Sequence, residues 1–390
     1  MNLQSILSSV LDDVYLKNEY PALAALEAEW THTRPFDGLR VLVATPIYRN
    51  TMTEYRALVA GGANLLVGYS EFNDPDVVDF MREWGVSVVT PAEMLEAESH
   101  GVFMDLILDC AGTFASLHPK IGFVELTRSG VQYYKNAQKP VYVADSGIVK
   151  RIETSLGTGD GYFRALEQLG FGRASENDFE GKRLLVFGSG KVGSGIALQG
   201  VRRGCCVTVV TDLNRLQSSV QTQNSENSMP AGDFSTMLLQ NDVNVVDCHE
   251  CAEVASLIAS SDFVVTATGI AGALAVPVIQ QALLSTSAVL ANMGVEDEYG
   301  AEIPAEKVLN AKGPLNFILE EPTHLKYIDT SLALHAALAE RLVQEATTLG
   351  DGLHFPPQEI EQRLLTIAIQ DGVIGPEICG MLGGIPAEID

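Results

Sequence analysis

The chain has 390 residues, of which 46% are hydrophobic and 19% are charged, and its formal net charge is −25. This composition is typical of a folded protein with room for two domains, and it excludes a disordered chain. No cluster of Lys and Arg side chains forms a basic face for the phosphate backbone of nucleic acid. We therefore expect binding neither to nucleic acid nor to an acidic membrane surface. The sequence has no membrane-length apolar run and no basic leader, which favours a cytoplasmic location.

From residue 39, apolar runs alternate with amphipathic helical segments. Residues 1–38 are expected to be helical, because their apolar side chains recur at helical spacing. The runs that follow are valine-rich and uninterrupted, which is typical of parallel strands covered on both faces. We expect these strands at 39–47, 64–70, 86–90, 104–112, 121–126 and 139–145.

A second alternating unit begins near residue 181. Its expected strands are 182–190, 205–212, 263–269 and 288–294, with helical segments between them. Residues 217–233 are polar and poor in hydrophobic side chains, so we expect a surface loop there. After residue 320 the sequence is again helical. The whole pattern predicts the α/β class, with two Rossmann-like doubly wound domains.

A glycine pattern, Gly188-Ser189-Gly190-Lys191-Val192-Gly193, lies between a predicted strand and a predicted helix. In this setting the first glycine makes the turn, the second admits a pyrophosphate, and the third lets the helix pack on the strand. Asp212 ends the next strand, where a carboxylate can bind both ribose hydroxyls and so favours NAD over NADP. We therefore predict NAD as cofactor; the alternative is a glycine turn that holds no nucleotide.

Two further strand ends extend this predicted site. The segments "TATG" (266–269) and "ANMG" (291–294) both fall at the carboxyl ends of strands, where open parallel sheets bind their ligands. From them we take Thr268, Gly269 and Asn292 as cofactor-binding candidates.

The order of these motifs resembles that of the S-adenosylhomocysteine hydrolase (adenosylhomocysteinase) superfamily. The resemblance covers roughly residues 40–300 and rests on six segments: "LILDCAG", "GFVELTRSGV", "ADSGIVKRIETSLGTGDG", "VFGSGKVGSG", "TATG" and "ANMG". It implies a substrate domain and an NAD-binding domain with a cleft between them, and a C-terminal segment that returns to the substrate domain. We accordingly expect domains at 1–158, 159–322 and 323–390, a homo-oligomer (dimer or tetramer), and NAD contacts from Thr127 and Ser129.

Several positions depart from the family's pattern. Cys110 stands where the resemblance implies a catalytic aspartate, Leu126 where it implies a ribose-binding glutamate, and Val295 where it implies a histidine. An alkyl side chain neither binds a ribose hydroxyl nor transfers a proton. We therefore expect a small polar metabolite other than S-adenosylhomocysteine as substrate.

Four charged residues remain as catalytic candidates. Lys150 and Glu153 are three residues apart, on one face if their segment is helical, and Asp109 and Glu125 end two strands. Each could instead be a surface or fold-supporting charge. The glycine run at 157–161 is expected to be a hinge.

The cluster "DCHEC" gives Cys248, His249 and Cys251, at most a partial zinc site, and we expect no metal. The leading functional hypothesis is an NAD-dependent enzyme acting either as a dehydrogenase or by transient oxidation. The alternatives are a divergent S-adenosylhomocysteine hydrolase and a catalytically silent NAD-binding regulatory protein.

Overall fold

The computed structural model describes residues 3–70, 73–145, 147–172, 179–214 and 243–382. The chain divides into two compact units. Unit 1 contains residues 1–152 and 324–376, and unit 2 contains residues 153–323 and 377–390. The predicted surface loop at 217–233 lies outside the described residues.

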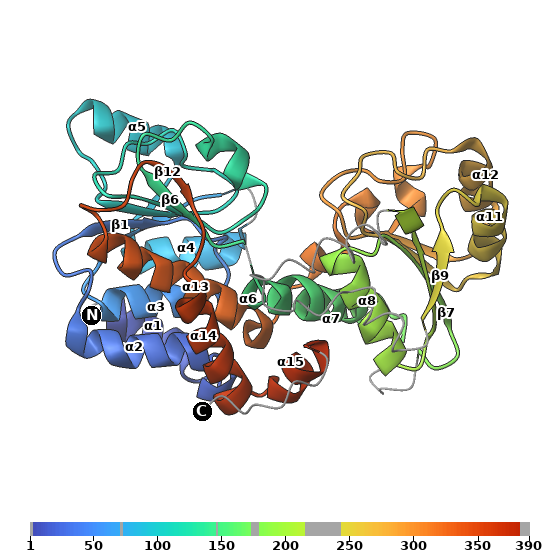
Figure 1. The fold of residues 1–390 in the computed structure, drawn as a ribbon, viewed down its shortest axis with the longest axis horizontal. Helices are drawn as coiled ribbons and strands as arrows, with labels where there is room; N and C mark the ends of the chain where they lie inside the picture. The colour runs from blue at the N-terminus through green and yellow to red at the C-terminus, as the bar shows by residue number, and fades with distance from the viewer. Residues whose placement is uncertain (1–2, 71–72, 146, 173–178, 215–242, 383–390) are drawn as a thin grey trace. The chain divides into compact units, whose positions relative to one another are not determined.

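Unit 1 is built on a parallel sheet with strand order β12-β6-β5-β4-β1-β2-β3 (Figure 1). Every pairing in this sheet is parallel, as the uninterrupted apolar runs predicted. Its strands are β1 (Arg40–Val43), β2 (Asn64–Gly68), β3 (Val88–Val89), β4 (Leu106–Asp109), β5 (Gly122–Glu125), β6 (Pro140–Val143) and β12 (Gly352–His354).

Helices cover both faces of this sheet. One face packs on α1 (Leu3–Leu11), α2 (Pro21–Thr33), α3 (Met52–Ala60), α4 (Pro75–Glu83), α13 (Leu325–Gln344) and α14 (Gln358–Asp371). The other packs on α5 (Pro91–Ser99) and the 3₁₀ turn η2 (Gly130–Tyr134). Alternate strand residues supply the two cores: Val41 and Val43 lie in the first, and Leu42 in the second. A further 3₁₀ turn, η1 (Lys17–Glu19), joins α1 to α2.

Helix α13 is the central buried element of unit 1. Its His335 is fully buried, with Nδ1 2.8 Å from Glu54 Oε1 of α3 and Nε2 3.0 Å from the Val124 carbonyl of β5. Burial lowers the pKa of His335, but Glu54 and that carbonyl outweigh burial and the pKa is raised. Asp329 of the same helix accepts hydrogen bonds from the backbone N–H groups of Ala22 and Leu23. These polar contacts fix how α13 is seated against α2, α3 and the sheet.

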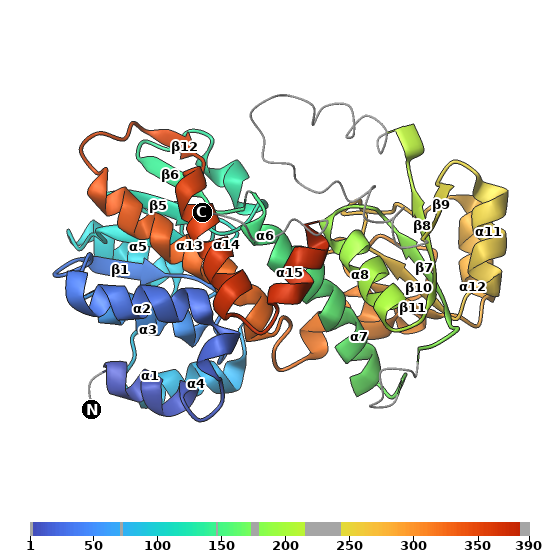
Figure 2. The ribbon, with the colours of Figure 1, turned by 60° about the horizontal axis from the view of Figure 1, so that its bottom comes forward.

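Unit 2 is a five-stranded parallel sheet with strand order β11-β10-β7-β8-β9 (Figure 2). One face packs on α7 and α8, and the other on α11 and α12. The strands are β7 (Arg183–Phe187), β8 (Cys206–Thr211), β9 (Asn244–Asp247), β10 (Phe263–Thr266) and β11 (Val289–Asn292). The helices are α7 (Thr158–Gln168), α8 (Lys191–Arg202), α11 (Cys251–Ser260) and α12 (Pro277–Ser285), followed by the 3₁₀ turns η4 (Ala305–Lys307), η5 (Leu309–Lys312) and η6 (Leu315–Ile318).

The two sheets confirm the predicted α/β class with two doubly wound, Rossmann-like halves. In unit 2 the chain order reverses between β7 and β10, which is the switch point where such sheets bind ligands. Strands β9 and β12 were not anticipated, and both are edge strands of no more than four residues. No helix within the described residues is both long enough and apolar enough to cross a membrane.

The chain passes between the units at three places, and the first of these segments is helical. It runs from α6 (Val149–Arg151) through the π-helical turn η3 (Ile152–Gly157) into α7. A Cβ on Gly159 would lie 2.5 Å from the Gly195 carbonyl oxygen, and one on Gly161 would lie 2.6 Å from the Pro322 carbonyl oxygen. Gly159 and Gly161 therefore permit close packing, and the expectation of a hinge at 157–161 stays a prediction. The short helix α15 (Gly375–Met381) ends the described chain.

The contact between the π-helical turn η3 and α8 predicts the effect of one substitution. A Cβ on Gly195 would lie 2.0 Å from the Ser155 carbonyl oxygen, and backbone cannot move aside as a side-chain tip can. Gly195→Ala should therefore lower the free energy of unfolding by about 1–3 kcal/mol, measured by urea titration, although alanine is the better helix former.

Gly350→Ala is the matched control, since nothing lies within 4 Å of its Cβ position. We expect it to change the free energy of unfolding by less than about 0.5 kcal/mol. A Gly195→Ala protein as stable as this control would contradict the packing role.

Candidate functional site

The loop between β7 and α8 needs glycine at its first and third positions for reasons of fold. Gly188 has a φ of +106°, and a Cβ on it would lie 2.5 Å from the Ala267 carbonyl oxygen of the adjacent strand end. A Cβ on Gly193 would lie 2.0 Å from the Gly188 carbonyl oxygen, so this glycine lets α8 approach the loop. Both positions match the geometric roles that the glycine spacing predicts.

Gly190 is different, because no contact within the described chain requires a glycine there. Its backbone is extended (φ −68°, ψ −173°), a conformation that any residue adopts, and nothing lies within 4 Å of its Cβ position. It is exposed and immediately precedes α8, whose first N–H groups have no partner within the helix. A Cβ at this position would occupy open space beside a helix N-terminus, where an anion such as a phosphate binds favourably.

Asp212 directly follows β8, next to this loop. A hydrogen bond of 2.8 Å between Ser189 Oγ and Thr211 Oγ1 ties the glycine loop to the end of β8. Asp212 Oδ1 accepts from the backbone N–H of Asn214, at 3.0 Å. Lys191 and Val192 are half-buried in the first turn of α8. The structure thus brings together the glycine loop and Asp212, as the sequence predicted.

Glu298 organises the strand-end loop that carries Thr268 and Gly269. It is fully buried, and its Oε2 accepts from the backbone N–H and the hydroxyl of Thr268, both at 2.8 Å. Its Oε1 accepts from the Gly269 N–H at 2.7 Å. Gly294 lies directly against this carboxylate, since a Cβ there would be 2.2 Å from Oε1. Sequence reasoning missed Glu298, which is 30 residues from Thr268 and belongs to no motif.

Asn292 uses its side chain to bind the protein itself. Its Oδ1 accepts from the Thr266 hydroxyl and the Gly294 N–H, each at 2.9 Å. Its Nδ2 donates to the carbonyls of Gly294, Glu296 and Lys312. This arrangement favours a positioning role, in which Asn292 holds the loop after β11.

In unit 1, Asp109 and Glu125 lie at the paired carboxyl ends of β4 and β5, and both are fully buried. Asp109 accepts hydrogen bonds from the N–H groups of Cys110 and Phe114 and from the Tyr134 hydroxyl. Burial, helped by the nearby charge of Glu125, raises the pKa of Asp109 to about 7.

Glu125 has a similar set of backbone partners. It accepts from the N–H groups of Ala111 and Gly112, each at 3.0 Å, and from both the N–H and the hydroxyl of Thr127. A Cβ on Gly130 would lie 2.4 Å from each of its carboxylate oxygens. The predicted catalytic role of Asp109 and Glu125 stays a prediction, and their contacts are those of residues that hold loops.

The predicted cofactor ligands Thr127 and Ser129 lie in the loop after β5, in unit 1, whereas the glycine loop lies in unit 2. Thr127 Oγ1 accepts from the Ala111 N–H at 2.9 Å, and Ser129 Oγ donates to Thr127 Oγ1 at 3.2 Å. Both hydroxyls therefore belong to the network around Glu125.

Lys150 and Glu153 lie in the helical segment between the units. Lys150 is 4% exposed and belongs to α6, while Glu153 is half-buried in the π-helical turn. The Thr158 hydroxyl donates to the Glu153 carbonyl five residues earlier, which matches the wider turn. A π-helical turn alters the spacing on which a shared α-helical face depends, and such turns occur frequently at functional sites.

Glu361 of α14 is a second residue that sequence reasoning missed. Its carboxylate lies against Gly147 (φ +74°), whose Cβ would be 1.9 Å from Oε1, just after β6. That oxygen is shut from solvent, with no hydrogen-bond partner among the described residues. Burial raises the pKa of Glu361 to about 7, against the lowering effect of the Val149 N–H. No short-range signal marks it, because Gly147 is more than 200 residues away.

Of the three positions that depart from the family's pattern, two are buried among apolar residues and one is exposed. Cys110 and Leu126 are 8% and 5% exposed and belong to the core of unit 1, whereas Val295 is 78% exposed. None of the three offers a carboxylate or an imidazole to a bound molecule.

The cluster at 247–251 is a weak metal candidate. Asp247, Cys248 and His249 place their ligand atoms within 4.8 Å of one another, without Cys251. Asp247 Oδ1 already accepts from the His249 N–H, and burial raises the pKa of the Cys248 thiol, which disfavours the thiolate that metals bind. The expectation of no metal stays a prediction.

The chain is 24% identical to the adenosylhomocysteinase of Sulfolobus acidocaldarius, an alignment that covers 92% of this chain and 90% of that protein. This near full-length similarity supports the resemblance seen in the motifs. No protein-family model matches it.

Solved structures with similar folds include a dipicolinate synthase polypeptide from Bacillus halodurans, at 13% identity and a TM-score of 0.44, covering 80% of this chain and 99% of that one. A transhydrogenase from Sinorhizobium meliloti has 14% identity and a TM-score of 0.42, with coverage of 80% and 98%. A glyoxylate reductase from Paecilomyes thermophila has 15% identity and a TM-score of 0.41, with coverage of 83% and 99%.

The environment of Glu361 predicts a dependence of stability on pH. Its folded-state pKa is about 7, above the ordinary value of 4.5, so between these pH values the folded chain holds a proton that the unfolded chain releases. Stability should therefore fall as pH rises through this window and then level off, by at most about 2 kcal/mol after allowing for partial exposure. Glu361→Gln, neutral at every pH, should remove this part of the slope in urea titrations at about pH 5, 6, 7 and 8.

Glu359→Gln, an exposed position on the same helix, is the control and should leave the slope unchanged. If Glu361→Gln and Glu359→Gln give the same pH profile as the parent protein, the raised pKa of Glu361 is wrong.

Proposed function

We propose that unit 2 binds NAD(H) and that the chain is an NAD-dependent enzyme. The observation that carries this proposal is Gly190, a glycine that the fold itself does not need, which leaves open space at the start of α8. Retention of glycine there is explained by a pyrophosphate whose oxygens approach the backbone. The retained Asp212 then lies where the adenosine ribose binds in folds of this type.

The carboxylate of Asp212 supports NAD rather than NADP as the cofactor. It can accept hydrogen bonds from both hydroxyls of an unmodified ribose, and it would repel a 2′-phosphate. Glu298 and Asn292 would act as positioning residues, because they hold the loops after β10 and β11 that line the same sheet edge. When bound, the nicotinamide would supply a hydride acceptor.

We propose a small polar metabolite other than S-adenosylhomocysteine as the substrate. The support is that Cys110, Leu126 and Val295 stand where the resemblance implies residues that bind ribose or transfer a proton. The glycine loop, in contrast, keeps the pattern that the resemblance implies. Lys150 and Glu153 are the proposed proton-transfer residues, since they belong to the segment that contains a π-helical turn. Asp109 and Glu125 would hold the loops after β4 and β5.

A divergent S-adenosylhomocysteine hydrolase is the second candidate, favoured by the similarity to the Sulfolobus acidocaldarius protein over nearly its full length. The two candidates share the cofactor and differ in the substrate. Release of adenosine from S-adenosylhomocysteine, assayed by chromatography at high enzyme concentration, separates them: turnover would support the hydrolase and remove the leading proposal.

Two neighbouring glycines distinguish a ligand effect from a folding effect. Gly190→Ala should weaken NADH binding at least about 10-fold, because the new methyl group occupies the space of the pyrophosphate, while the melting temperature stays unchanged. Gly193→Ala should lower the melting temperature, since its Cβ would meet the Gly188 carbonyl oxygen. NADH fluorescence titration and thermal unfolding measure the two effects.

NADPH serves as the ligand control and should bind more weakly than NADH. If the parent protein binds neither dinucleotide, or if Gly190→Ala binds NADH as the parent does, the cofactor proposal fails.

A further inference from the structure

Three consecutive residues of unit 2 have left-handed backbone conformations: φ is 51° at Asn310, 48° at Ala311 and 71° at Lys312. Asparagine adopts this conformation more readily than alanine or lysine, in which Cβ comes too close to a carbonyl oxygen. The other described non-glycine residues with positive φ, Arg34 and Ala111, occur singly. Strain of this kind persists only where the surrounding structure holds it, and it is concentrated at functional sites.

Pairing with the sheet does not require this left-handed turn. The segment that contains it runs beside β11 and forms two isolated parallel bridges, Leu290 with Val308 and Asn292 with Pro314. The bridges are two residues apart along β11 but six residues apart along the partner segment. The turn takes up the additional residues between the bridges, so it serves something other than the pairing itself.

Lys312, the last residue of the turn, contacts both ends of the loop after β11. Its carbonyl accepts from Asn292 Nδ2 at 2.7 Å, where that loop begins. Its Nζ donates to Asp297 Oδ2 at 2.8 Å and to the Gly300 carbonyl at 2.7 Å. The Lys312 side chain is 11% exposed, so its ammonium is largely removed from water and these acceptors replace its hydration.

Asp297 connects Lys312 to a second loop. Its Oδ1 accepts from the N–H groups of Tyr299 and Gly300, at 3.0 and 3.1 Å, which closes the turn at 297–300. Its carbonyl accepts from the N–H of Gly272, at 2.8 Å, and Gly272 belongs to the loop after β10. Lys312 therefore fixes the loop after β11 directly and the loop after β10 through Asp297.

These two loops lie on one side of the point where the strand order reverses, and β8 with Asp212 lies on the other. In a doubly wound sheet, each side of that point binds one half of a dinucleotide. Since Asp212 is proposed to bind the adenosine ribose, the loops after β10 and β11 belong to the nicotinamide half. The loop after β11 is open to a ligand at its tip, where Val295 is 78% exposed.

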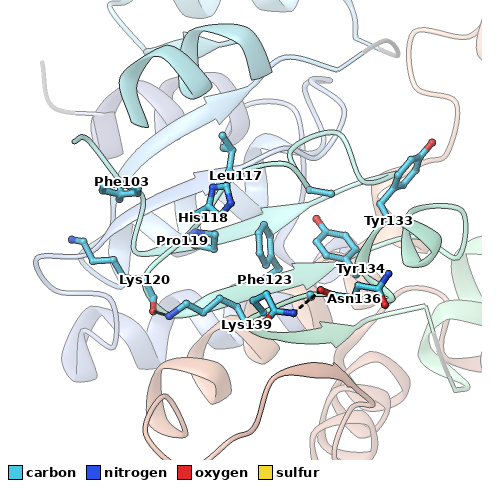
Figure 3. Close-up of a pocket in the computed structure, with 13 residues that line it drawn as sticks. Phe103, Leu117, His118, Pro119, Lys120, Phe123, Tyr133, Tyr134, Asn136 and Lys139 are labelled. Carbon is cyan, nitrogen blue, oxygen red and sulfur yellow. Dashed lines mark hydrogen bonds between the residues drawn. The ribbon is translucent and has the colours of Figure 1, made fainter. Parts of the chain in front are cut away.

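The hollow of unit 1 drawn in Figure 3 has no comparable feature. Its volume is about 410 Å³, and none of the described residues of the segment 103–139 that line it has a positive φ. Phe123 and Tyr134 are 3% and 1% exposed there, so the protein already covers both rings.

We propose that Lys312 is a positioning residue for the nicotinamide half of the dinucleotide. It acts through the loops after β10 and β11, whose conformation it fixes before the ligand binds. This inference rests on the proposed binding of NAD(H) by unit 2, and it identifies the residue that orders the second half of that site.

Binding of NADH and of ADP-ribose to the full chain tests the proposal, because ADP-ribose lacks the nicotinamide. Lys312→Met removes the ammonium and keeps an unbranched side chain. It should weaken NADH binding at least about 10-fold and ADP-ribose binding by less than about 2-fold in isothermal titration. The fluorescence of bound NADH reports the surroundings of the nicotinamide, and in this variant it should shift toward that of free NADH. Lys312→Arg, which restores the positive charge, should bind NADH more tightly than Lys312→Met.

Lys307→Met is the matched control, and it should leave both affinities unchanged. Lys307 lies five residues earlier, and its Nζ donates to the Thr286 carbonyl, which belongs to neither loop, at 3.1 Å. Asp297→Asn removes the charged partner of Lys312 instead of the lysine and should reproduce the selective loss of NADH. This second variant keeps the test decisive if Lys312→Met does not fold.

Ala311→Gly tests the turn itself. Glycine has no Cβ to strain at a φ of 48°, so the midpoint of urea unfolding should rise while NADH binding stays as in the parent. A lower midpoint would contradict the strain from which the role of the turn is inferred.

The inference is overturned if Lys312→Met and Asp297→Asn bind NADH as the parent does, or if they lose NADH and ADP-ribose equally. A parent protein that binds neither ligand would refute the proposed function and the inference with it. A parent protein that binds both, together with variants that keep both, would refute the inference alone.

Discussion

A glutamate carboxylate seated directly on a glycine recurs at three strand ends of this chain. Glu125 lies on Gly130, Glu298 on Gly294 and Glu361 on Gly147, and in each pair a Cβ on the glycine would come within 1.9–2.4 Å of a carboxylate oxygen. Because the glycine has no side chain, the carboxylate sits against backbone and can reach its N–H groups. Each contact therefore requires both members of the pair.

The cost of burying a carboxylate explains why these contacts fix the conformation of the loops. A carboxylate removed from water is costly unless hydrogen bonds replace its hydration, and bonds to a charged acceptor are the stronger kind. Glu125 and Glu298 obtain theirs from backbone N–H groups and from the hydroxyls of Thr127 and Thr268. A shift of either loop would leave a buried charge and several donors unpaired. Functional loops held in this way keep their geometry before any ligand arrives, which binding sites need.

Short-range patterns in the sequence predicted the strands, the helices and the glycine loop, because these features depend on residues close together in the chain. The strand-helix alternation predicted both parallel sheets, and the spacing of Gly188, Gly190 and Gly193 matched the turn, the open position and the helix contact. The sequence did not indicate that glycine in the run 157–161 also serves close helix packing, as Gly159 does against α8. Glu298 and Glu361 could not be found in this way, since each acts on a glycine or a loop that only the fold brings near.

The central claim is that unit 2 binds a dinucleotide, although Cys110, Leu126 and Val295 depart from the pattern that the resemblance implies for the substrate. The most direct test is to denature the purified full-length protein and quantify NAD⁺ and NADH in the supernatant by liquid chromatography and mass spectrometry. We expect bound dinucleotide, or saturable uptake of added NAD⁺ or NADH by protein that was purified without it. A chain that carries none and takes up none would contradict the account, because Gly190 and Asp212 would then have no ligand to explain them.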